Sequence, residues 1–120
     1  MKSEKSKKLL IPHRNVIHVV DESEILFCQS ENCYTTVFLS DGRSFVLIKS
    51  LTKLEKEVHQ SVFIKVSQSF LVNRNKIVNI DKKNRYLHVG LESPIPFTIT
   101  VKRLLELITG DSMIHSPEVS

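Results

Sequence analysis

The residues best suited to contact a ligand lie in a polar interruption between two β-rich runs. The segment reads FIKVSQSFLVNRNKIVNI over positions 63–80. The amide of Gln68 can form paired hydrogen bonds with an adenine, and the hydroxyls of Ser67 and Ser69 can donate to phosphate oxygens. The simpler alternative is a turn in which these side chains satisfy the local backbone. Taken by itself, the segment favours the second interpretation.

No other group of residues has the pattern of a catalytic or metal site. The three glycines, Gly42, Gly90 and Gly110, cannot make a glycine-rich phosphate loop. No serine has the flanking glycines of a nucleophile elbow, and there is no HExxH sequence. The histidines lack metal spacing, and Cys28 and Cys33 have no second pair of ligands for zinc. We therefore expect no enzymatic activity, no metal and no cofactor.

The length and the cysteine content indicate one ordinary domain. A chain of 120 residues can bury one core but not two. No apolar run approaches the ~18 residues of a membrane span, and the polar start does not resemble a secretory signal. Two cysteines in a chain of this size indicate free thiols, so we expect a cytoplasmic protein with no membrane contact.

The net charge of +4 is contributed by the first fourteen residues, and the remainder is neutral overall. Charges are nevertheless unevenly distributed along this remainder. Six bases and a single acid lie between Lys65 and Arg85, whereas four acids and no base lie between Asp21 and Glu31. Such polarity would offer a basic face to phosphates. The alternative is chance clustering on a solvated surface.

Short β-rich runs make up most of the chain and predict a mostly β fold of about eight to ten strands. The expected strands lie at 15–20, 26–30, 34–40, 43–49, 63–66, 70–73, 77–80, 86–91 and 95–99. Asp41-Gly42 is the strongest hairpin signal. The apolar centre of 43–49 suggests burial on both faces. No βαβ alternation is present, and no two helices are joined by a short turn, which argues against helix-turn-helix.

Apolar residues recur at helical spacing over residues 51–58 and 101–108, and predict two short helices. The first helix could begin at Ser50 or with a capping box from Thr52. Gly110 is a natural residue to end the second helix.

Several short motifs, in this order, resemble those of the LytTR family. They are Ile25-Leu26-Phe27, Asn32-Cys33-Tyr34, Leu39-Ser40-Asp41-Gly42, Ser50-Leu51-x-x-Leu54-Glu55, and Ser69-Phe70-Leu71-Val72-Asn73 followed by Ile77 and Ile80. Each motif alone is weak, but their order and spacing together are specific. The similarity covers roughly Pro12 to Ile108.

The resemblance implies a DNA-binding domain of bacterial response regulators, built as an elongated set of small antiparallel β-sheets. Loops of such domains enter successive major grooves of double-stranded DNA. The expected function is sequence-specific binding to promoter DNA, as a transcriptional regulator or as the output domain of a two-component system. The expected sites are direct repeats, one domain to each repeat, with a dimer possible on DNA and a receiver domain possible in the native chain.

The resemblance also implies contact residues, carried over by motif. The expected base contacts are Tyr34, Gln68 and Lys102. The expected contacts to the DNA backbone are Asn32, Lys49, Ser50, Lys65, Ser67, Ser69, Thr100 and Arg103. Gln68 stands where the family more often has Arg or Asn, Ser67 replaces a frequent His, and Lys102 stands where Arg is typical. The base preference of other members therefore does not transfer to this chain.

These expectations divide the chain into three parts. Residues 1–11 are expected to be a flexible basic lead-in or linker, residues 12–109 the LytTR-type domain, and residues 110–120 a disordered tail. The substitutions at Ser67 and Gln68 keep an alternative function open. In that alternative, the domain is a β-rich protein-interaction or regulatory module that does not bind DNA.

Overall fold

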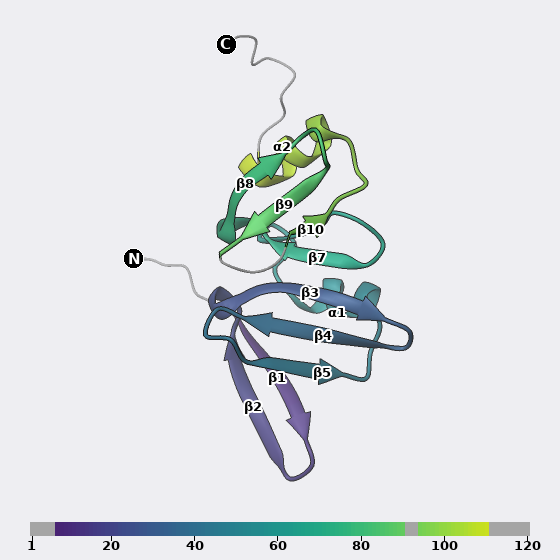
Figure 1. Cartoon of the computed structure of the whole chain (residues 1–120). Coiled ribbons are helices and arrows are strands. Elements are labelled where there is room, and N and C mark those ends of the chain that lie inside the picture. Colours follow the sequence, from purple (N-terminus) through teal and green to yellow (C-terminus); the bar gives the residue numbers. More distant parts are fainter. Residues whose placement is uncertain (1–6, 91–93, 111–120) are drawn as a thin grey trace, which may run out of the picture.

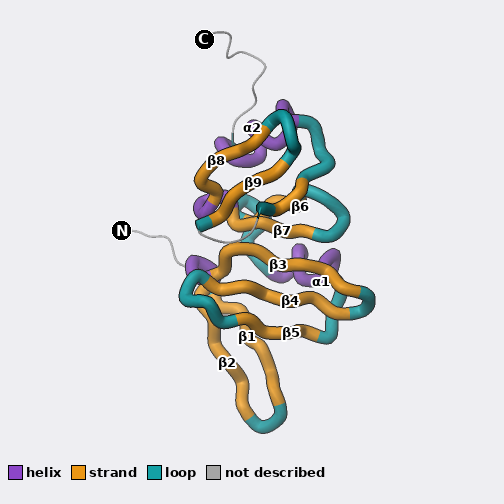
Figure 2. Tube along the Cα trace, in the orientation of Figure 1, coloured by secondary structure: helices purple, strands orange, loops and turns teal. Residues whose placement is uncertain are grey.

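A computed structural model describes residues 7–90 and 94–110, which form ten short strands in three antiparallel sheets (Figure 1). Two α-helices and two short 3-10 helices complete this part of the chain (Figure 2). The principal extents are 54 × 38 × 25 Å. The expected architecture, an elongated set of small antiparallel sheets with two helices, is confirmed.

The first two strands form a separate hairpin that projects from one end of the molecule (Figure 1). Strand β1 (Lys8–His13) pairs with β2 (Val16–Asp21), and Leu9 and Ile11 are buried in the core. The flexible lead-in expected at residues 1–11 is therefore too long. Residues 8–11 belong to the fold, because alternating Leu9 and Ile11 give the strand one face that can be buried.

The central sheet contains five strands in the order β5-β4-β3-β7-β6. These are β3 (Ile25–Glu31), β4 (Tyr34–Leu39), β5 (Ser44–Leu47), β6 (Phe63–Lys65) and β7 (Phe70–Asn73). Strand β3 pairs with both β4 and β7, and its last partners are Tyr34 and Phe70, respectively. The turn after β3 and the loop before β7 therefore lie at the same end of the sheet, on the right in Figure 1.

Strand β5 is an edge strand, and the prediction that residues 43–49 are buried on both faces is wrong. Val46 is 53% exposed and Ile48 is 82% exposed. Asp41-Gly42 does form the predicted turn into this strand, with φ of 94° at Gly42. Burial on both faces occurs instead in β3, β7 and β6, whose apolar side chains are divided between two cores on opposite faces of the sheet.

One face of the central sheet is covered by α1 (Leu51–Glu57). Its buried residues Leu51 and Leu54 share a core with apolar side chains of β3, β4 and β7. The helix begins at Ser50, whose hydroxyl accepts a hydrogen bond from the Lys53 N–H at 3.1 Å. Ser50 is therefore the N-cap, and Thr52 lies inside the helix.

The other face carries a second core with the three-stranded sheet β10-β9-β8 and the last helix. The elements are β8 (Ile77–Asp81), β9 (Tyr86–Val89), β10 (Ile95–Pro96) and α2 (Val101–Thr109). The 3-10 helices η1 (Glu22–Glu24) and η2 (Arg74–Lys76) precede β3 and β8. Gly110 ends α2 in the left-handed conformation, as predicted. The tail expected beyond it, residues 111–120, lies outside the described residues.

Candidate nucleic-acid interface

The loop between β6 and β7 leaves Gln68 available to a ligand. The Ser69 N–H donates to the Ser67 hydroxyl at 3.2 Å, and the Val66 N–H donates to the Phe70 carbonyl at 3.1 Å. Gln68 is exposed, and its amide forms no hydrogen bond with any other described residue. The structural interpretation therefore holds for Ser67, whose hydroxyl stabilises the turn. Contact of Gln68 with a ligand stays a prediction.

The turn between β3 and β4 consists of Asn32 and Cys33, and both side chains are exposed. Asn32 has φ of 57°, a left-handed conformation that asparagine adopts more readily than most residues. Tyr34 follows as the first residue of β4 and is half-buried. The strand pairing thus holds Tyr34 at the edge of the sheet, next to an exposed turn.

Helix α2 begins at Thr100, whose hydroxyl accepts a hydrogen bond from the Arg103 N–H at 3.1 Å. Lys102 lies in the first turn and is exposed. The first N–H groups of a helix and a nearby ammonium together favour an anion. The entrance of α2 can therefore contact a phosphate or the acceptor atoms of a base.

These three features lie on one side of the molecule and are joined by backbone hydrogen bonds. The Ser30 N–H, next to the β3–β4 turn, donates to the Ser69 carbonyl at 2.8 Å. The Thr98 N–H, two residues before Thr100, donates to the Val66 carbonyl at 2.9 Å. A cleft of about 410 Å³ lies between the β6–β7 loop and the segment before α2, lined by Ser67, Gln68, Ser69, Phe70, Pro96 and Thr98. The right side of Figure 1 shows the three loops in a row.

The remaining expected contacts are not equally available. The Lys49 ammonium lies 2.6 Å from Glu57 Oε1, so its charge is already paired within the protein. The carbonyl of the same residue accepts from the Thr35 hydroxyl at 2.9 Å, which places it near the start of β4. Ser50 is exposed, and Lys65 is half-exposed at the end of β6.

Comparison with known proteins identifies the family and agrees with the observed fold. The family model described as the LytTr DNA-binding domain matches residues 15–108. The chain belongs to this family. The domain is also similar to the solved LytTr DNA-binding domain of a Bacillus cereus protein, with a TM-score of 0.70, 20% identity, 89% of this chain covered and 99% of that one. At this identity the likeness shows a shared fold. No curated protein matches the chain.

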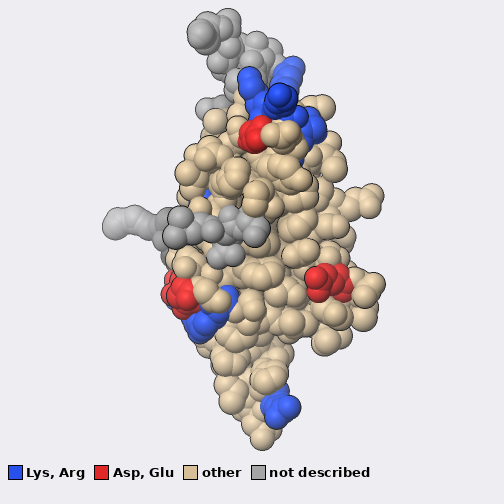
Figure 3. Space-filling view, in the orientation of Figure 1, with Lys and Arg blue, Asp and Glu red and all other residues tan. Residues whose placement is uncertain are grey.

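Charge is unevenly distributed over the LytTR domain. Figure 3 shows acidic side chains at the end of the β3–β4 hairpin and a group of Lys and Arg side chains at the end that contains the β8–β9 turn and α2. Exposed Glu31 accounts for acidity beside Asn32, and exposed Lys82, Lys83 and Arg85 lie in the β8–β9 turn. The bases between Lys65 and Arg85 include these three residues and suggested a basic face for phosphates. None of the three was among the individual contact residues expected from the sequence.

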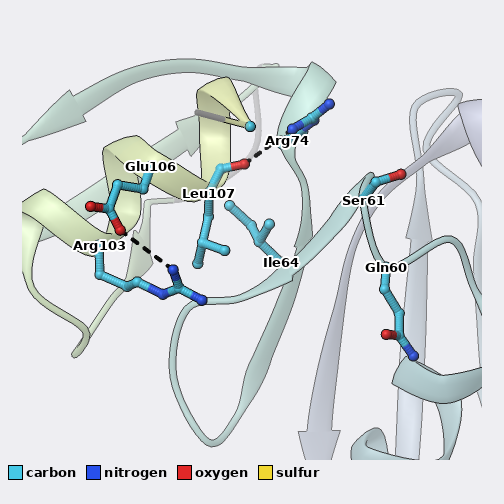
Figure 4. A pocket seen from close by; sticks show the side chains of 8 residues that line it. Gln60, Ser61, Ile64, Arg74, Arg103, Glu106 and Leu107 are labelled. Carbon is cyan, nitrogen blue, oxygen red and sulfur yellow. Dashed lines mark hydrogen bonds and ion pairs between the residues drawn. The ribbon is translucent and has the colours of Figure 1, made fainter. Parts of the chain in front are cut away.

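A separate cleft of about 340 Å³ lies beside the second half of α2 (Figure 4). Arg103 lines it and pairs with Glu106 at 3.4 Å, while Arg74 donates to the Leu107 carbonyl at 3.2 Å. Arg103, an expected contact to the DNA backbone, therefore lines a different cleft from Gln68.

The described residues show little sign of other chemistry. They contain no group of three or more His, Cys, Asp or Glu side chains that could hold a metal ion. None of the helices found among them has the length and hydropathy to cross a membrane. Both cysteines are free thiols, and burial raises the pKa of Cys28 to about 12, whereas Cys33 is exposed. The buried thiol is therefore unreactive at neutral pH.

Proposed function

We propose that this LytTR domain binds double-stranded promoter DNA sequence-specifically, with its loops in the major groove, and acts as a transcriptional regulator or the output domain of a two-component response regulator. One observation carries the proposal. Exposed Gln68 has no hydrogen-bond partner among the described residues, and its loop is bonded to both the β3–β4 turn and the segment before α2. Membership of a DNA-binding family supports it. The Bacillus cereus relative is itself named as part of a response regulator.

The residue types suit contacts to base edges at three positions. Gln68 can bond bidentately to adenine, Lys102 can donate to the acceptors of guanine, and the Tyr34 ring and hydroxyl can contact a base edge. Contacts to phosphate are proposed for Asn32, Ser50, Lys65, Ser67, Ser69, Thr100 and Arg103. Lys49 joins them only if its ion pair with Glu57 opens.

Replacing Gln68 by alanine tests the base-contacting role. Loss of a bidentate contact should weaken binding to the preferred duplex by about 1–3 kcal/mol while random duplex DNA binds as before. The operator is first selected from random duplexes, which also tests whether the preferred sites are direct repeats bound by one domain each. Binding is then measured by fluorescence anisotropy.

Gln60→Ala is a matched control. Gln60 is also exposed, and it precedes β6, whereas Gln68 follows that strand. The control should bind like the unmodified protein. Equal binding of both duplexes to the Gln68 variant and the unmodified domain would refute the role of Gln68. Absence of duplex binding at low salt would refute the proposed function and leave the protein-interaction module.

A further inference from the structure

The turn between β8 and β9 is a compact basic feature with its own internal bonds. Asn84 closes the turn, because its backbone N–H and its side-chain Nδ2 donate to the two carboxylate oxygens of Asp81 at 3.0 and 2.9 Å. Lys82 and Lys83 lie between them and are exposed. Neither ammonium group forms an ion pair or hydrogen bond with another described residue. Their ammonium groups are therefore available to an external anion.

Arg85 ties this turn to the segment that leads into α2. The Arg85 guanidinium donates to the Ile99 carbonyl at 2.6 Å and lies 4.7 Å from the centre of the Phe97 ring. The backbone completes the connection, because the Phe97 N–H donates to the Arg85 carbonyl at 3.2 Å. Thr100, the N-cap of α2, directly follows Ile99. The basic turn and the entrance of α2 are therefore held in one fixed arrangement.

The electrostatic balance of this end favours a polyanion. The turn contains three bases, and Asp81, the last residue of β8, is already bonded by Asn84. Figure 3 shows a group of Lys and Arg side chains at this end of the molecule. Each phosphate that such a side chain neutralises releases counterions, and this release is the main source of sequence-independent affinity for DNA.

We propose that the β8–β9 turn binds the sugar-phosphate backbone of duplex DNA through Lys82 and Lys83, beside the groove that receives the entrance of α2. Arg85 is a positioning residue that holds this contact in register with Lys102. The inference rests on the proposed function and deepens it. It extends the DNA footprint beyond the three base-contacting positions, toward the basic end of the domain.

The double variant Lys82→Ala/Lys83→Ala tests the phosphate contacts. Two lost contacts should reduce the magnitude of the slope of log K against log salt concentration by about 1.8. Binding near 0.15 M salt should weaken about 30-fold, if the electrostatic contribution vanishes near 1 M. Selected and random duplexes should lose affinity alike, because phosphates carry no sequence. Binding is measured by fluorescence anisotropy across a salt titration.

The control variant Lys7→Ala/Arg14→Ala removes the same charge from elsewhere. Both residues are exposed; Lys7 precedes β1, and Arg14 lies in the turn of the projecting β1–β2 hairpin, at the opposite end from α2 (Figure 1). If the two double variants shift affinity and salt slope equally, the effect is one of net charge and the inference is overturned. If the unmodified domain binds no duplex at all, the proposed function fails first, and this result is distinguishable from the other.

Arg85→Ala tests positioning separately. If Arg85 acts through the entrance of α2, its loss should reduce the ratio of selected to random binding, as Lys102→Ala does. Adding Arg85→Ala to Lys102→Ala should reduce that ratio no further. If Arg85 only stabilises the fold, its loss should lower thermal stability and leave the ratio of selected to random DNA binding by the folded protein unchanged. That result would contradict the positioning role.

Discussion

Replacing Asn73 by alanine would show how much of the Ser69-to-Asn73 motif serves the fold and how much serves DNA. Asn73 is the last residue of β7 and is 1% exposed. Its Nδ2 donates to the Ile25 carbonyl at 2.8 Å, at the start of β3. Its Oδ1 accepts from the Asn75 N–H at 2.9 Å and so caps η2. One side chain thus joins the central sheet to the connection that leads into β8.

The size of the effect follows from these two bonds. Removing the donor leaves the carbonyl of fully buried Ile25 without this partner, which costs about 1–3 kcal/mol. Loss of an N-cap costs about 1 kcal/mol, less where water reaches the freed N–H. We therefore expect Asn73→Ala to lower the free energy of unfolding by about 2–4 kcal/mol, a large fraction of the ~5–15 kcal/mol that stabilises most domains.

Urea unfolding followed by circular dichroism measures this change. Asn75→Ala is the matched control, because Asn75 is exposed and its side chain forms no hydrogen bond with another described residue. That control should alter the free energy of unfolding by less than about 0.5 kcal/mol. DNA affinity of folded Asn73→Ala should equal that of the unmodified protein. A loss of stability no larger than the control's, or a loss of affinity in the folded variant, would refute the structural role.

Two further predictions concern Glu31, at the end of β3, and the two cysteines. Glu31→Gln should tighten binding of every duplex by about two- to fivefold at low salt, because it removes a negative charge beside the proposed phosphate contacts. The gain should fade as salt screens the charge, and fluorescence anisotropy at two salt concentrations measures it. A gain that persists undiminished at high salt would count against the electrostatic cause. Iodoacetamide near pH 8 should modify Cys33 and spare Cys28 until the protein unfolds, because Cys28 is buried with a pKa of about 12. Mass spectrometry counts the labels. Equal rates of modification for the two thiols would contradict the buried position of Cys28.

Local interactions explain which features the sequence predicts well. The Asp41-Gly42 turn and the Gly110 helix end each depend on residues within a few positions, and both occur where expected. The start of α1 was left open between Ser50 and Thr52, and Ser50 is the cap. Strand β1 was missed because only Leu9 and Ile11 mark its buried face, and lysines precede them. A short alternation at the edge of a charged segment is too weak a signal to predict a strand.

Availability of the contact residues depended on partners far away in the chain. Gln68 was an expected contact from motif and chemistry, but its freedom from local bonds is a property of the folded loop. The sequence also suggested Lys49, whose charge is neutralised by Glu57 from the following helix. The link between Arg85 and Ile99 spans fourteen residues and has no counterpart in any local pattern.

The sequence by itself determined the family, the mostly β composition and the residue types offered to DNA, because periodicity and turn chemistry are encoded within a few neighbouring residues. Only the tertiary structure decided that β3 and β7, and not β5, are buried on both faces, and which loops share one side of the molecule. Strand order and register arise from pairings between distant segments. A pattern of period two shows that a strand has two faces, but not which neighbours will cover them.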